Sequence, residues 1–103
     1  MSYQSKMKSK QTDQLFEAIL KLETKEECYR FFDDLCTIKE IQSMTQRFEV
    51  ADLLSEEMTY NEIEEKTGAS TATICRINKC LNYGADGYKL ILGKLKSNSG
   101  EEE

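Results

Sequence analysis

Apolar residues recur along this chain at intervals of three and four positions, the spacing of a helix with one buried face. This pattern predicts four helices, over residues 13–22, 24–35, 37–54 and 86–96. Their apolar positions are Leu15, Phe16, Ile19 and Leu20; Cys28, Phe31, Phe32 and Leu35; Ile38, Ile41, Met44, Phe48, Ala51 and Leu54; and Tyr88, Ile91, Leu92 and Leu95. Because the chain has no proline and only five glycines, little interrupts the pattern, and it predicts an all-α fold.

Three of the predicted helices begin with a capping box. In this motif a threonine hydroxyl accepts from a first-turn N–H, and a glutamate three residues later reaches back to the threonine N–H. The three pairs are Thr24 with Glu27, Thr37 with Glu40, and Thr59 with Glu62. These pairs predict that helices begin directly after Thr24, Thr37 and Thr59.

Residues 59–81 are typical of a helix-turn-helix, which brings the number of predicted helices to six. Gly68 supplies the left-handed backbone that ends the first of its two helices. Either Ser70 or Thr71 caps the second. The expected inward residues are Ile63, Ile74 and Ile77.

The length of 103 residues suits one domain, expected over residues 12–97. Residues 1–11 are polar and predict a flexible basic arm, although a plain disordered terminus has the same composition. Residues 98–103 predict a disordered acidic tail. No stretch resembles a signal peptide or a membrane span, so we expect a cytoplasmic protein.

The net charge of −5 is unevenly distributed. Residues 13–57 carry twelve acidic and five basic residues, whereas residues 68–97 carry five basic residues and one acidic residue. The second helix of the helix-turn-helix and the segment after it are therefore basic in an acidic chain, which favours an anionic partner. An ordinary solvated surface could have the same charge, so charge alone does not decide between the two.

Neither metal chemistry nor catalysis is expected. Cysteines 28, 36, 75 and 80 lack the close paired spacing of a zinc site, and we expect reduced thiols that act as small hydrophobic residues, with no metal, disulfide or cofactor. The chain has no histidine and no glycine-rich phosphate loop. Asp33 and Asp34 adjoin each other but point in different directions on a helix, so an enzyme is not expected.

The chain resembles the Trp repressor superfamily, and within it the small YerC/YecD-like branch of Gram-positive bacteria. The matching segments are CYRFFDDLCTIKEIQSMTQRFEVADLL (28–54), TYNEIEEKTGASTATICRINKCLNYG (59–84) and the DGYKL that follows. The resemblance covers residues 13–97. It implies a six-helix Trp repressor-like fold, an intertwined homodimer, and a helix-turn-helix on each chain that binds double-stranded DNA.

The resemblance does not extend to tryptophan binding. In the tryptophan-sensing repressor the indole ring lies between two arginines, against a glycine and a serine. Arg76 matches one arginine, but the other position holds Gln46, the glycine position Ile77 and the serine position Cys80. A branched side chain at Ile77 would fill the space of the indole ring, and Gln46 supplies no planar cation. We therefore expect no response to tryptophan.

In a helix-turn-helix the second helix enters the major groove with its N-terminal residues nearest the bases. Short side chains there can reach base edges, and basic and polar residues farther out can hold phosphates. The predicted DNA-binding residues are Tyr60, Asn61, Ser70, Thr71, Ala72, Thr73, Cys75, Arg76 and Lys79. Local roles compete with this interpretation, because Ser70 and Thr71 could serve only as caps, and Arg76 could serve only to pair with an acid such as Glu62.

The expected function is a sequence-specific transcriptional regulator, a repressor, that binds a palindromic operator as a homodimer. The alternative is a protein-interaction module in which the helix-turn-helix serves only as a packing unit. RNA binding is less attractive, because the sequence offers no evident exposed aromatic platform.

Overall fold

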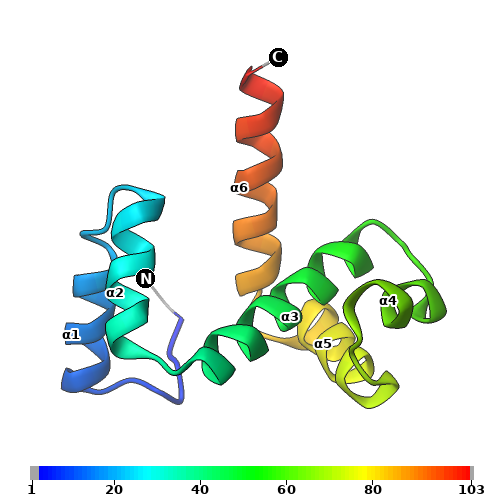
Figure 1. Cartoon of the computed structure of the whole chain (residues 1–103), viewed down its shortest axis with the longest axis horizontal. Coiled ribbons are helices and arrows are strands. Elements are labelled where there is room, and N and C mark those ends of the chain that lie inside the picture. Colours follow the sequence, from blue (N-terminus) through cyan, green and yellow to red (C-terminus); the bar gives the residue numbers. More distant parts are fainter. Residues whose placement is uncertain (1–2, 103) are drawn as a thin grey trace. The chain divides into compact units, whose positions relative to one another are not determined.

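The computed structural model describes residues 3–102, with side chains up to residue 97, as six helices and no strand (Figure 1). The helices are α1 (Lys10–Ile19), α2 (Lys25–Leu35), α3 (Ile38–Ser55), α4 (Tyr60–Thr67), α5 (Thr71–Tyr83) and α6 (Gly87–Glu102). The all-α prediction is confirmed. The chain divides into two units, one ending at Ile38 and one beginning at Lys39. Within the described range, no helix combines the length and apolar character needed to cross a membrane.

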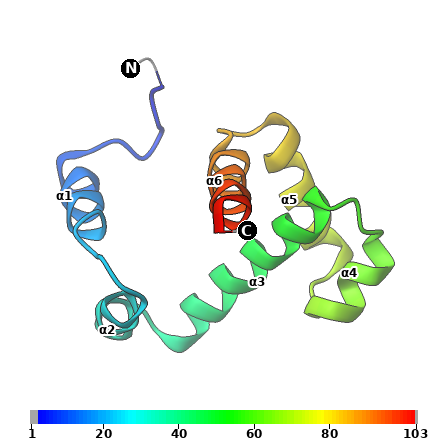
Figure 2. The same ribbon diagram turned by 90° about the horizontal axis from the view of Figure 1, so that it is seen from above.

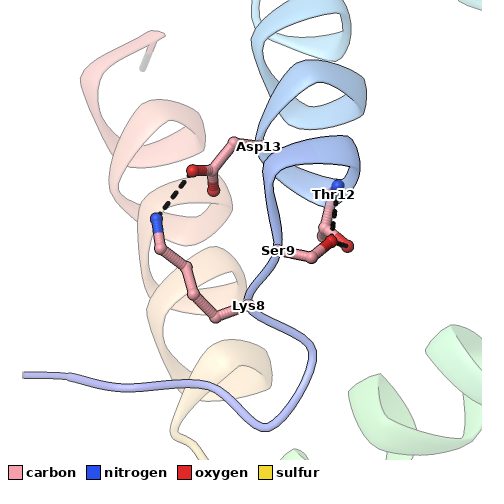
Figure 3. A network of polar contacts seen from close by, with 4 residues as sticks. All are labelled: Lys8, Ser9, Thr12 and Asp13. Carbon is pink, nitrogen blue, oxygen red and sulfur yellow. Dashed lines mark hydrogen bonds and ion pairs between the residues drawn. The ribbon is translucent and has the colours of Figure 1, made fainter.

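In the first unit, α1 begins three residues before the predicted start. The Ser9 hydroxyl accepts from the Thr12 N–H at 3.0 Å and thereby caps the helix, while Lys8 forms an ion pair with Asp13 at 2.7 Å (Figure 3). The predicted flexible arm over residues 1–11 is therefore helical at its end, whereas residues 1–2 lie outside the described residues. The helix also ends at Ile19 instead of residue 22.

The start of α2 matches its prediction, but the capping box at Thr24 is incomplete. The Thr24 hydroxyl accepts from the Glu27 N–H at 3.1 Å, as expected. The Glu27 carboxylate, however, accepts from the N–H of Glu23 and not from that of Thr24. Phe31 and Phe32 pack edge to face, with ring centroids 5.5 Å apart. Neither α1 nor α2 contains a buried residue.

In the second unit, α4 and α5 lie beside the C-terminal half of α3 (Figures 1 and 2). Buried apolar residues of these three helices, together with one residue of the turn, form a single cluster, which we call the helix-turn-helix core. Its members are Val50, Ala51, Ile63, Ala69, Ile74, Ile77 and Leu81. The predicted inward positions Ile63, Ile74 and Ile77 are confirmed.

The predicted inward face of α3 is correct only near its C-terminal end. Ala51 is fully buried and so is Val50, which was not predicted. Ile38, Met44 and Phe48 are instead exposed, by 75%, 40% and 37%. The α4–α5 pair covers only the C-terminal half of α3, and the buried face is set by that contact.

The last helix is longer than predicted. It continues to Glu102, so residues 98–102 are helical where the sequence predicts a disordered acidic tail, and only residue 103 lies outside the described residues. The segment contains no proline, so every backbone N–H is available to continue the helical ladder. Leu92 is buried and Tyr88 packs against the helix-turn-helix core, whereas Leu90, Ile91 and Leu95 are exposed.

Gly68 ends α4 in the left-handed conformation, with φ of 75°, and its N–H donates to the Glu64 carbonyl. A side chain at this φ is strained even though no atom lies within 4 Å of the position that a Cβ would take.

We expect Gly68→Ala to lower the free energy of unfolding by about 1–2 kcal/mol in urea denaturation. Gly87→Ala is the matched control, since Gly87 has neither a positive φ nor a close neighbour, and it should leave stability nearly unchanged. Equal effects of the two substitutions would contradict this account of the turn.

Candidate helix-turn-helix interface

The capping box at the start of α4 is complete. The Thr59 hydroxyl accepts from the Glu62 N–H at 3.2 Å, and the Glu62 carboxylate accepts from the Thr59 N–H at 2.9 Å. These bonds to Thr59, from its backbone first and then its side chain, lower the pKa of Glu62 below its ordinary value, and Lys66 lowers it further. The box confirms the prediction at Thr59 and fixes the direction in which α4 leaves the preceding loop.

Hydrogen bonds centred on Thr67 hold the turn between α4 and α5. The Thr67 hydroxyl donates to the Ile63 carbonyl at 2.8 Å and accepts from the Ala69 N–H at 3.1 Å. Gln46 on α3 donates from Nε2 to the Thr67 carbonyl at 3.1 Å in a half-buried position. The turn is therefore bonded within itself and also to the scaffold helix.

Ser70 caps α5, which resolves the choice between Ser70 and Thr71. Its hydroxyl accepts from the Thr73 N–H at 3.2 Å and donates to the Thr73 hydroxyl oxygen at 3.1 Å. The Thr71 hydroxyl donates instead to the Glu64 carboxylate on α4. Each hydroxyl at the start of α5 thus has a defined hydrogen-bonding partner.

All nine predicted DNA-binding residues lie on α4, on α5 or at the cap of α5, and none of them is fully buried. Tyr60 and Thr73 are half-buried, and Tyr60 packs against the helix-turn-helix core. The other seven are exposed: Asn61, Ser70, Thr71, Ala72, Cys75, Arg76 and Lys79. Accordingly, the fold presents these residues on one helix pair and leaves most of them accessible to a partner.

The basic residues of α5 are not neutralised by neighbouring acids. Neither Arg76 nor Lys79 forms an ion pair with a residue in the described part of the chain, whereas Lys8–Asp13 and Arg30–Glu26 in the first unit do form ion pairs. The competing interpretation of Arg76, a pair with Glu62, is therefore not observed. Glu62 is bonded to Thr59 instead, and the Arg76 guanidinium remains available to an anion.

The sequence predicts that the cysteines are reduced thiols that act as small hydrophobic residues. All four are free thiols, but Cys28, Cys75 and Cys80 are exposed and Cys36 is half-buried. No three histidine, cysteine or acidic side chains in the described part of the chain are grouped in a way that could hold a metal ion.

Glu64 and Thr67 also organise the site, although neither is among the residues predicted from the sequence. A threonine directly before the helix-ending Gly68 was a usable signal for Thr67, since threonine hydroxyls readily bond the carbonyl four residues earlier. Glu64 had no comparable signal, because its partner Thr71 lies seven positions away across the turn.

Comparison with known proteins identifies relatives over almost the whole chain. The family model "Trp repressor protein" matches residues 10–96. An uncharacterised protein of Bacillus subtilis strain 168, YerC, is 58% identical over 96 residues, which cover 93% of this chain and 92% of YerC.

Two crystal structures have the same fold. A TrpR-like protein from Eubacterium eligens is 56% identical, with a TM-score of 0.85 over 88% of this chain and 94% of its own. A candidate Trp repressor from Staphylococcus aureus is 50% identical, with the same TM-score over 88% of this chain and 91% of its own.

The capping box predicts a pH-dependent contribution to stability. Because the pKa of Glu62 is lowered in the folded chain, its contribution is present above the unfolded pKa and is lost as pH falls through the folded pKa. Thr59→Ala keeps the backbone N–H that bonds to Glu62 and removes only the bond from the hydroxyl, so the Glu62 pKa should rise part of the way toward its ordinary value, as measured by NMR titration of the side-chain carboxyl. An unchanged Glu62 midpoint in this variant would show that the Thr59 hydroxyl does not contribute to the lowered pKa.

Proposed function

The chain is a member of the Trp repressor protein family, and from this premise we propose that it is a transcriptional repressor that binds double-stranded DNA sequence-specifically. It acts in the cytoplasm as a homodimer, through the helix-turn-helix of each chain, and recognises a palindromic operator. Family membership supports a DNA-binding regulator in general. The operator, the dimer and the individual contacts are part of the proposal.

One observation carries the proposal: the two faces of α5 differ sharply. Ile74, Ile77 and Leu81 are buried in the helix-turn-helix core and fix the helix on its scaffold. The residues between them and at the N-terminal end carry short hydroxyl, methyl and basic side chains, and nearly all are exposed. A short, fixed helix with small side chains at its N-terminal end has the form that enters a major groove.

Contacts divide into those near the bases and those near the phosphates. Ser70, Thr71, Ala72, Thr73 and Cys75 lie on the first turns of α5 or at its cap and are assigned to base edges, with Ala72 suited to a thymine methyl group. Arg76 and Lys79 on α5, and Tyr60 and Asn61 on α4, are assigned to the backbone. Because five basic residues and one acidic residue lie in residues 68–97, this region attracts DNA even though the whole chain is acidic.

The homodimer is supported by apolar surface that a single chain leaves uncovered. Helices α1 and α2 have 10 and 11 residues and bury none of them, and helices of that length are marginal without packing. On α6, Leu90, Ile91 and Leu95 are 62%, 44% and 49% exposed. A second copy of the chain would cover such surfaces, and a two-fold symmetric dimer would match a palindromic site.

Tryptophan is not the proposed co-regulator. Ile77 stands at the glycine position of the tryptophan-sensing repressor, and its burial in the helix-turn-helix core, with 2% exposed, supports the expectation that its side chain leaves no room for an indole ring. Gln46, at the second arginine position of the tryptophan-sensing repressor, is engaged with the Thr67 carbonyl. Neither residue offers a site for the amino acid.

Binding to a pool of genomic DNA fragments at two salt concentrations tests the proposed function. We expect recovery of a palindromic sequence, affinity that falls steeply with salt, and no effect of added tryptophan.

Arg76→Ala should weaken binding to all sequences and reduce the salt slope by about one. Thr73→Ala should lower preference for the selected site by about 1–3 kcal/mol while leaving non-specific binding nearly intact.

Lys25→Ala serves as a charge-matched control for Arg76→Ala, since Lys25 is exposed on α2, outside both the helix-turn-helix and the basic residues 68–97. If neither Arg76→Ala nor Thr73→Ala changes any interaction with DNA, the helix-turn-helix is only a packing unit. The protein-interaction module would then be the better account.

Sedimentation equilibrium tests the dimer. We expect the chain at micromolar concentration to have twice the mass of a monomer. Leu95→Asp should weaken self-association by more than about tenfold, because it places a charge on the uncovered face of α6. Ser97→Asp, at a nearby exposed and neutral position of α6, adds the same negative charge and is the matched control. A wild-type monomer at this concentration would contradict the proposal.

A further inference from the structure

The hydroxyl groups at the start of α5 differ in what they can offer to DNA. A threonine hydroxyl has one proton to donate and two lone pairs with which to accept. The Thr71 hydroxyl donates that proton to the Glu64 carboxylate. A carboxylate is an acceptor only, so the direction of this bond is fixed by chemistry. Toward solvent, Thr71 can therefore present only lone pairs.

Glu64 also prevents the Thr71 hydroxyl from binding a phosphate group. Its side chain is half-buried on α4 and its carboxylate lies within hydrogen-bonding distance of Thr71. A phosphate has only acceptor oxygens and carries negative charge, so it cannot bond to a hydroxyl with no free proton and is repelled by the carboxylate. The neighbouring cap does not compensate, because the Ser70 hydroxyl is already bonded to the N–H and the hydroxyl of Thr73.

We propose that Glu64 is a specificity-determining residue: by holding the Thr71 proton, it makes Thr71 a reader of base amino groups. In the major groove the amino donors are adenine N6 and cytosine N4, whereas guanine presents N7 and O6 and thymine presents O4 as acceptors. Thr71 thus selects adenine or cytosine at the base that it contacts. This inference rests on the proposed DNA-binding function and assigns a role to a residue that does not itself contact DNA.

The Thr73 hydroxyl bonds in the opposite direction to the Thr71 hydroxyl, so the two residues can be compared within the same helix. Its hydroxyl oxygen accepts from Ser70, and its own proton is not used by any described residue. Thr73 can therefore donate to an acceptor on guanine, adenine or thymine, or to a phosphate. Two threonines two residues apart on α5 are thus given different tasks by their neighbours.

Selection of sites from a random-sequence duplex pool tests the inference, with the wild-type protein, Glu64→Ala and Glu65→Ala compared. Both variants remove one negative charge from α4, but Glu65 is exposed and makes no side-chain hydrogen bond to a described residue. Both should therefore strengthen non-specific binding alike. In Glu64→Ala alone, the preference for adenine or cytosine at one position of each half-site should fall about threefold to tenfold, the magnitude of one hydrogen bond.

Thr71→Val identifies which position of the half-site Thr71 contacts, because valine keeps the shape of threonine without its hydroxyl. It should lose the same preference at the same base as Glu64→Ala. Should Glu64→Ala fail to fold, Glu64→Gln and Glu65→Gln replace the pair, since the glutamine amide can donate to Thr71 and so releases its proton for other partners.

The inference is overturned if Glu64→Ala keeps the wild-type preference, or if the preference lost in Thr71→Val is for guanine or thymine. Suppose that the wild-type protein and Glu65→Ala select the same site and that Glu64→Ala also keeps the wild-type base preference. That result rejects the role of Glu64 but does not affect the proposed function. Failure of the wild-type protein to select any sequence rejects both.

Discussion

The burial of three isoleucines against the C-terminal half of α3 is the interaction on which the second unit depends. Ile63 and Ile74 have no exposed surface and Ile77 has 2%, and each such side chain contributes about 1.5–3 kcal/mol. Their cluster with Val50 and Ala51 sets how α4 and α5 are placed on the scaffold helix. Every exposed residue of α5 takes its direction from this packing, so the same contact that stabilises the fold determines which side chains can meet DNA.

Hydrogen bonds add to the apolar packing that places α4 and α5 on α3. Thr67 links the end of α4 to the turn, and Gln46 joins the Thr67 carbonyl to α3, so the turn cannot move independently of the scaffold without losing a hydrogen bond. Glu64 then determines the hydrogen-bonding polarity of Thr71. The chain thus separates the residues that hold the helix-turn-helix from those that face solvent, and Glu64 connects the two groups.

Features set by neighbouring residues were predictable, whereas those set by distant contacts were not. The capping box at Thr59, the left-handed Gly68 and the inward isoleucines follow from local spacing, and all three are present. The face of α3 was predicted incorrectly around Met44 and Phe48, because periodicity cannot tell which part of a long stripe another helix covers. The bond between Glu64 and Thr71 crosses the turn, so it depends on an angle between helices that the sequence pattern does not contain.

NMR titration with a duplex of random sequence at low salt tests most directly whether the helix-turn-helix is the DNA-binding surface. We predict that the largest amide shifts fall in residues 59–79 and that they diminish as salt is raised, since phosphate contacts release counterions. Shifts confined to α1 and α2, or no shifts at any salt concentration, would contradict the account.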